Sequence, residues 1–279
     1  MQWENTAEEE LMTVPSYVRP MVREKVEEYV DSKGENVVTL ADIKDARERF
    51  QAVMSGKSES ELRDMMPKEN QPGVEMVVIE TCHNELSDCP NPLIRTSEWK
   101  DAIEQWAREN DISEKLRRLV KDNKVRYHNR LRISISGCPN SCSRPQIADI
   151  GLVGFICPEF VPTDCTSCGS CADVCPDCAI RFDGDTPWFD FKKCQGCKAC
   201  SKICPAGCIY QSEPSVRIIV GGKLGRHPHL AEQIGEADNP QEAVEFIDRI
   251  VADYLENAEP GERFADYWLR CGREKAVNE

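Results

Sequence analysis

Hydrophobic and polar positions alternate in some parts of the chain and follow a helical period in others. Residues 130–136 alternate polar and apolar side chains, which predicts a strand with one buried face. Three more short apolar segments predict strands, and they cover residues 74–81, 149–155 and 215–220. These segments supply the β part of the predicted fold.

Apolar residues at helical spacing predict helices between and after these strands. Ser97 caps an amphipathic run that continues through Trp106, and residues 111–120 predict a second helix. Asn239 and Pro240 begin a longer helix, and a short helix follows over residues 262–269. Strands and helices together predict the α+β fold class.

The first fifty residues differ in character from the rest, because they contain no cysteine and carry two helical patterns. One pattern runs from Pro15 onward. The other is capped by Thr39 and covers residues 40–50. We predict a small helical domain over residues 1–55 and a polar linker over residues 56–73.

Length and charge narrow the functional classes. The 279 residues are enough for about two domains. Acidic residues outnumber basic ones by 49 to 35, and the net charge of −14 opposes the phosphate neutralisation on which nucleic-acid binding depends. No segment approaches the roughly 18 consecutive apolar residues of a membrane span, and the first residues lack the pattern of a secretory signal. We therefore expect a cytoplasmic protein with no nucleic-acid partner and no membrane insertion.

Cysteine spacing is the most specific feature of the sequence. Eight of the sixteen cysteines form two runs that repeat after 29 residues, Cys165-x2-Cys168-x2-Cys171-x3-Cys175-Pro176 and Cys194-x2-Cys197-x2-Cys200-x3-Cys204-Pro205. Each run is a complete bacterial [4Fe-4S] ligand pattern, because a tight loop can wrap three thiolates around one face of a cubane. Zinc sites or disulfides are the alternatives, and two full repeats disfavour them.

The two runs resemble the bacterial two-cluster ferredoxins over about residues 158–213. In that family the fourth cysteine of each run serves the other cluster. The resemblance therefore implies two ligand sets, which are Cys165, Cys168, Cys171 and Cys204, and Cys194, Cys197, Cys200 and Cys175. The hairpin predicted between the runs would shield the sulfur atoms from water.

Four further cysteines form looser pairs, Cys82 with Cys89 and Cys138 with Cys142. The second pair lies in the segment Ile-Ser-Ile-Ser-Gly-Cys-Pro-Asn-Ser-Cys-Ser-Arg-Pro over residues 133–145, which is followed by Asp-Ile-Gly. This segment closely resembles the second cluster motif of the sirohaem-dependent sulfite and nitrite reductases. The later segment Gly-Gly-Lys-Leu-Gly-Arg-His-Pro resembles the glycine-rich segment of the same family.

The second resemblance implies a third [4Fe-4S] cluster on Cys82, Cys89, Cys138 and Cys142, with Cys142 bridging the cluster to a sirohaem iron. The first pair is usually separated by five residues in that family, and here six residues intervene. Family members carry their ferredoxin insert just after the Asp-Ile-Gly strand. The expected architecture is a sulfite-reductase-like α/β unit with an inserted two-cluster ferredoxin module, divided into residues 74–156 and 214–279 for the unit and 157–213 for the module.

A sirohaem carries eight carboxylates and needs several cations around it. The candidates near the two family motifs are Arg130, Arg132, Arg144, Lys223 and Arg226. Ordinary surface ion pairs are the alternative interpretation of each. The chain also lacks most of the half-domain that precedes the first cysteine pair in the family, so it would bind the ring incompletely, share it with another subunit, or have lost it.

Two functional interpretations stay open. The first is a small sulfite or nitrite reductase, of dissimilatory or assimilatory type, in which electrons pass through the two inserted clusters to the third and across Cys142 to a sirohaem that reduces a small anion. The second is a sirohaem-free electron-transfer subunit. Either interpretation requires a redox donor and a redox acceptor. In the second interpretation, the subunit and its acceptor belong to a larger reductase complex.

The N-terminal segment adds a third resemblance. Trp3, Ala7, residues 14–19 and Val26-Glu27 resemble the small helical domain of the light-independent protochlorophyllide reductase B subunit, which helps to cover a tetrapyrrole. Tetrapyrrole handling is therefore a further functional hypothesis, and a helical docking module is its alternative.

The remaining cysteines and histidines suggest no further chemistry. Cys157, Cys178, Cys208 and Cys271 are interpreted as small buried residues. The four histidines show no Ser-His-Asp or Cys-His arrangement, so hydrolytic chemistry has no support.

Overall fold

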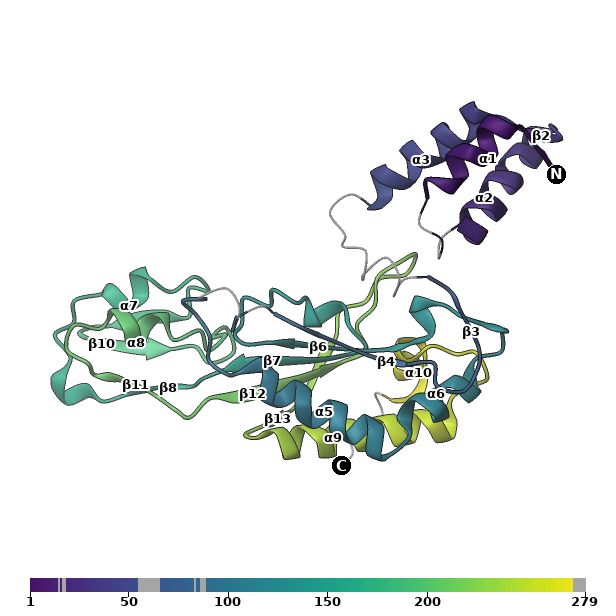
Figure 1. Cartoon of the computed structure of the whole chain (residues 1–279). Helices are drawn as coiled ribbons and strands as arrows, with labels where there is room; N and C mark the ends of the chain where they lie inside the picture. Colours follow the sequence, from purple (N-terminus) through teal and green to yellow (C-terminus); the bar gives the residue numbers. More distant parts are fainter. Residues whose placement is uncertain (15, 17–18, 55–65, 83, 86–88, 273–279) are drawn as a thin grey trace. The chain divides into compact units, whose positions relative to one another are not determined.

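The computed structural model describes residues 1–272 except residues 15, 17–18, 55–65, 83 and 86–88 (Figure 1). It divides into two compact units, Met1–Pro67 and Lys68–Glu279. The start of the helix expected from Pro15, and most of the expected linker, lie outside the described residues. Lys68 and Glu69, at the end of that linker, form β3 (Lys68–Glu69), which pairs with β5 (Lys124–Val125) of the second unit.

In its described residues, the first unit is a bundle of three helices, α1 (Asn5–Met12), α2 (Arg19–Ser32) and α3 (Leu40–Met54). A short parallel pair, β1 (Gln2–Trp3) with β2 (Val37–Val38), ties the chain start to the α2–α3 connection. The bundle buries one apolar stripe from each helix, and its core contains Ala7, Leu11, Val26, Val30, Val38 and Ile43. The helix predicted over residues 40–50 is confirmed as α3. The helix α1 was not predicted.

The second unit is built on a five-stranded sheet in the order β13-β12-β7-β6-β4. Its strands are β4 (Val77–Thr81), β6 (Leu131–Ser136), β7 (Ile150–Phe155), β12 (Ser215–Val220) and β13 (Glu232–Ala237). The first three run parallel, and β12 is antiparallel to both of its neighbours. The four predicted strands are present, and β13 is an addition.

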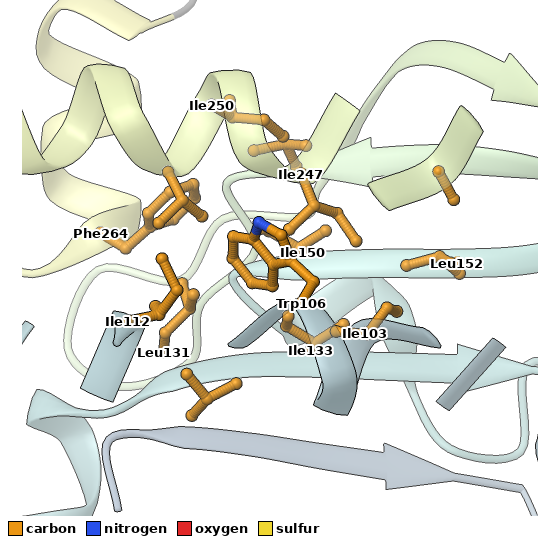
Figure 2. Packing of buried hydrophobic residues seen from close by; sticks show 14 of the residues in the cluster. Ile103, Trp106, Ile112, Leu131, Ile133, Ile150, Leu152, Ile247, Ile250 and Phe264 are labelled. Atoms are coloured by element: carbon orange, nitrogen blue, oxygen red, sulfur yellow. The ribbon is translucent and has the colours of Figure 1, made fainter. Parts of the chain in front are cut away.

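The helices α5 (Thr96–Glu109), α6 (Ile112–Leu119) and α9 (Pro240–Asn257) bury their apolar stripes against one face of this sheet (Figure 2). Ile133 and Ile150 from the strands meet Trp106 and Ile247 from the helices in that core. The opposite face of β6 is covered by the loop that follows it, because the Ser134 hydroxyl donates to the Ser143 carbonyl over 2.8 Å.

The α5 start differs from the prediction. Ser97 does not cap the helix, because the helix begins at Thr96 and the Glu85 carboxylate accepts from both the backbone and the hydroxyl of Ser97, over 2.9 and 2.7 Å. An acceptor from outside the helix thus replaces the expected cap. The predicted start of α9 is confirmed, since the Asn239 side chain caps the helix by accepting from the backbone N–H of Glu242 over 3.1 Å.

A smaller module joins the end of β7 to the start of β12 and lies beyond that end of the sheet (Figure 1). Its base is β8 (Pro158–Phe160) paired with β11 (Ile209–Gln211), and the predicted hairpin is β9 (Ile180–Asp183) with β10 (Thr186–Phe189). Two short helices, α7 (Ser170–Asp173) and α8 (Ala199–Ile203), follow the two cysteine loops.

The C-terminal end of the second unit is α10 (Phe264–Tyr267), continued by a wider helical turn over Trp268–Gly272. Trp268 packs against the face of the glycine-rich segment, where a Cβ added to Gly221 would lie 2.2 Å from its ring. Across the described residues, no helix combines the length and the hydrophobicity that a bilayer crossing requires.

Candidate iron–sulfur centres

The inserted module encloses two pockets, and each gathers four of the repeated cysteines. The outer pocket, of about 310 Å³, is lined by Cys165, Cys168, Cys171 and Cys204. The inner pocket, of about 370 Å³, is lined by Cys175, Cys194, Cys197 and Cys200. In each pocket the fourth cysteine of one run therefore joins three cysteines of the other run.

Apolar side chains close both pockets. Phe160 and Phe182 line the outer pocket, and Ile180 and Phe189 line the inner one, so the β9–β10 hairpin contributes to each. Burial raises the pKa of the Cys200 thiol to about 11. A metal centre would be needed to hold such a thiol as thiolate near neutral pH, because a coordinated thiol is deprotonated.

The tight cysteine loops use left-handed backbone at equivalent positions of the repeat. Ser167 and Gly196 are separated by 29 residues and have φ of 55° and 70°, and Gly169 and Lys198 have φ of 79° and 61°. Gly196 needs the absence of a side chain, because a Cβ there would lie 2.4 Å from the carbonyl oxygen of Ile156. Lys198 carries a side chain and therefore lacks the conformational freedom of glycine. The cysteine pattern did not predict its left-handed backbone.

The third quartet forms at the carboxyl ends of two neighbouring parallel strands. Cys82 follows β4 and Cys138 follows β6, and the backbone N–H of Gly137 donates to Cys82 Sγ over 3.1 Å. Burial raises the pKa of Cys138, and charge on Cys82, Cys89 and Cys142 raises it further. That Cys89 completes this quartet, despite the six-residue spacing, stays a prediction. Cys142 is exposed.

The cysteine sets offer thiol donors, which as thiolates are the ligands of iron–sulfur clusters. All sixteen cysteines are free thiols. Ligands of one zinc ion converge to about 2.3 Å from a common point, whereas a cubane separates its four thiolates by its own core. Within the described part of the chain, no three or more His, Cys, Asp or Glu side chains are arranged to hold a single metal ion.

The inner pocket is fixed to the sheet and to the third quartet by specific contacts. The Ile156 backbone N–H donates to Gly196 O over 3.1 Å, and Arg217 of β12 donates to Gln195 O over 3.1 Å. Lys198 Nζ donates to Pro92 O over 2.8 Å, and Lys202 Nζ donates to Pro90 O over 3.0 Å. The second cysteine loop therefore lies against the segment that carries Cys89.

The cysteines outside the quartets have different surroundings. Cys208 is buried, as expected, and its Sγ lies 3.3 Å from Cys204 Sγ in the outer pocket. The interpretation as a buried residue is wrong for Cys157 and Cys178, which are exposed. Cys157 lies just after β7, and Cys178 follows the turn at residues 176–177 and itself has left-handed backbone, with φ of 49°.

Two of the five cations considered for a sirohaem already have partners within the protein. Arg132 pairs with Glu80 over 3.2 Å, and Lys223 pairs with Asp266. The backbone N–H of Arg132 also donates to Asp149, whose backbone oxygen accepts from Gly221, so Asp149 joins the two family motifs. Burial raises the pKa of Asp149 to about 6.

The other three cations have no ion-pair partner among the described residues. Arg144 and Arg226 are exposed. Arg130 is 4% exposed, and its Nε and Nη2 atoms are buried without a hydrogen-bond partner. It precedes β6, whose six residues span about 20 Å, so it lies at the end of that strand remote from Cys138. A buried guanidinium of this kind fits an anionic group.

Comparison with known proteins finds similarities in both parts of the chain. Residues 77–279 match the family model "Nitrite and sulphite reductase 4Fe-4S domain", and residues 3–47 match "Proto-chlorophyllide reductase 57 kD subunit". The coenzyme F420-dependent sulfite reductase of Methanocaldococcus jannaschii is 39% identical over 168 residues, which are 59% of this chain and 27% of that protein. One subunit of the anaerobic sulfite reductase of Salmonella typhimurium is 35% identical over 69 residues, 25% of this chain and 19% of that protein.

A solved structure supports the fold. The dissimilatory sulfite reductase I structure aligns with a TM-score of 0.50 and 15% identity, covering 73% of this chain and 52% of that chain. The chain thus spans about a fifth to a half of the length of these larger relatives. Because the family model covers most of its length, the chain belongs to the nitrite and sulphite reductase 4Fe-4S domain family.

Proposed function

We propose that this protein carries electrons through three [4Fe-4S] clusters, in the order outer pocket, inner pocket, third quartet, and delivers them for the reduction of sulfite. When bound, such clusters supply one-electron transfer. The residues of the chain supply twelve thiols in three groups, and apolar side chains line the pockets of the first two. The observation that best supports the proposal is the contact of the second cysteine loop with the segment carrying Cys89.

The choice of sulfite follows from the relatives, whose names specify sulfite reductases. A sirohaem would supply the iron at which the anion is reduced. Cys142 is the residue best suited to contact that iron, whereas Arg130, at the other end of β6, would face a carboxylate at the rim of the ring. Cys142 is the exposed member of the third quartet, and Arg130 holds an unpaired buried charge.

A sirohaem-free electron-transfer subunit is the second candidate. It is favoured by the pairing of Arg132 with Glu80 and of Lys223 with Asp266, and by the packing of Trp268 against Gly221, which together leave fewer groups for a tetrapyrrole. In this case a larger reductase complex would accept the electrons, in keeping with the name of the Salmonella relative, which is one subunit of a reductase.

Anaerobic purification followed by analysis of iron, acid-labile sulfide and tetrapyrrole tests both candidates. Three clusters require about twelve irons and twelve sulfides per chain. Tetrapyrrole together with sulfite reduction driven by reduced methyl viologen would support the reductase. Full iron and sulfide without tetrapyrrole or turnover would support the carrier, and a protein with no iron or sulfide would refute both.

A further inference from the structure

Lys198 breaks the symmetry of the two cysteine loops. The 29-residue repeat makes it equivalent to Gly169, and both residues have left-handed backbone, with φ of 61° and 79°. Glycine adopts this conformation freely, whereas a residue with a side chain adopts it at a steric cost. The second loop therefore has a lysine at a left-handed position where the first loop has glycine, the residue that adopts this conformation most easily.

The Lys198 side chain reaches out of its own loop. Its Nζ donates to Pro92 O over 2.8 Å, three residues beyond Cys89. Lys202, one turn later on α8, makes a parallel contact to Pro90 O over 3.0 Å. Two lysines thus attach the inner loop to the Cys89 segment, and only one of them directly follows an inner-pocket cysteine, Cys197.

The position of Lys198 also gives it an electrostatic role. Its ammonium is held against the carbonyl oxygen of Pro92, in the segment that carries Cys89. Its backbone follows Cys197 of the inner pocket. A half-buried cation between two thiolate groups is screened less than a surface charge.

We propose that Lys198 is a positioning and potential-setting residue that couples the inner cluster to the third cluster. The inference rests on the three-cluster function proposed above. When one electron leaves the inner cluster and enters the third, no bond or proton changes, and negative charge moves from one side of the ammonium to the other. The cation stabilises the reduced form of both clusters, and its hydrogen bond to Pro92 fixes their separation.

Redox titration monitored by electron paramagnetic resonance tests this directly on the intact protein. Lys198→Met removes the charge and the hydrogen bond, and Lys198→Arg keeps a cation. Lys202→Met is the matched control, because it removes the neighbouring anchor. Lys198→Gly restores the residue of the first loop and relieves the backbone strain. Signals are assigned through Cys168→Ser, Cys197→Ser and Cys89→Ser, one for each cluster.

In Lys198→Met and Lys198→Gly we expect lower potentials for the inner and third clusters, with the reduced-to-oxidised ratio at fixed potential falling about tenfold, which is 59 mV for a one-electron couple. The outer cluster, beside Gly169, should not change, and Lys198→Arg and Lys202→Met should resemble the wild type. Unchanged potentials in Lys198→Met, or equal shifts in all three clusters or in Lys202→Met, would overturn the inference while leaving the three-cluster function intact. Absence of cubane signals from the wild-type protein would refute both.

Discussion

The backbone N–H of Gly137 donates a hydrogen bond to the Sγ atom of Cys82 over 3.1 Å, across the ends of two parallel strands. A Cβ on Gly137 would lie 2.4 Å from Nδ2 of Asn84 and 3.3 Å from the Ile94 carbonyl oxygen. Gly137→Ala should therefore push the Cys82 segment away from Cys138. We expect a loss of about 1–3 kcal/mol in stability and of the third cluster alone, measured as a drop of about one third in iron and sulfide.

A second substitution separates this steric effect from general damage. Asn84→Ala removes the atom that the new methyl group would meet, so the double variant Gly137→Ala, Asn84→Ala should recover part of the lost iron. If Gly137→Ala alone retains all its iron, the close approach at this position does not hold the third quartet together.

If the fourth cysteine of each run binds the cluster of the other run, replacing Cys175 and replacing Cys178 should have different effects. Cys175 lines the inner pocket with cysteines of the second run, whereas Cys178 is exposed and lines neither pocket. We expect Cys175→Ser to lose the inner cluster and Cys178→Ser to keep all three. Alkylation under anaerobic conditions, read by mass spectrometry, should then label Cys194, Cys197 and Cys200 in Cys175→Ser. Labelling of Cys165, Cys168 and Cys171 instead would mean that each run serves its own cluster.

Much of this arrangement could be predicted because its signals are local. The 29-residue cysteine repeat and the alternation before Cys138 need only neighbouring residues, and they indicated the module and the strand that carries the third quartet. The contact between Lys198 and Pro92 joins residues 106 positions apart, and no periodicity records it. The only hint of this contact in the sequence was the difference between Gly169 in the first repeat and Lys198 in the second. The contact that this lysine makes follows only from the folded loops.

The glycine-rich segment shows what the sequence could not predict. Its resemblance to the family segment connects it with a sirohaem, but Gly221 packs against Trp268, 47 positions later, and a Cβ on Gly222 would lie 2.5 Å from the carbonyl oxygens of Gln146 and Ala148. Sequence showed that side chains were excluded at these positions. It could not show that the excluding groups belong to the protein itself.

The pH dependence of the N-terminal unit should depend on Asp42. Burial alone would raise its pKa, but hydrogen bonds from Lys33 and from the hydroxyl and backbone of Thr39 outweigh burial and lower the pKa to about 2. A lowered folded-state pKa stabilises the fold above the unfolded-state pKa near 3.8, and this stabilisation is lost as the pH falls from there to about 2. We therefore expect Asp42→Asn to destabilise the unit by about 1–2 kcal/mol at pH 7.

Hydrogen exchange of the α2 and α3 amides in the full-length protein measures this effect. Asp45→Asn, an exposed change on the same helix, is the matched control and should exchange like the wild type. Equal exchange rates in Asp42→Asn and Asp45→Asn would show that the Lys33 and Thr39 contacts contribute nothing to stability.

Arg130 provides a test of whether the protein holds an anionic ring. Its guanidinium is 4% exposed and has two buried nitrogen atoms without partners, which is an unfavourable arrangement for a protein that binds no anion there. Arg130→Met keeps an unbranched apolar stem and removes the charge. Without a ligand, we expect this variant to be more stable than the wild type by about 2 kcal/mol.

A bound sirohaem reverses the sign of that effect. The carboxylates of the ring would then compensate the charge of Arg130, so Arg130→Met would lower the tetrapyrrole content and the thermal stability of the purified protein. Arg126→Met is the matched control, because Arg126 is an exposed arginine that pairs with Asp122. A more stable Arg130→Met protein, with iron unchanged and no tetrapyrrole in either variant, would decide for the electron carrier, whereas lower stability with tetrapyrrole loss confined to Arg130→Met would decide for the reductase.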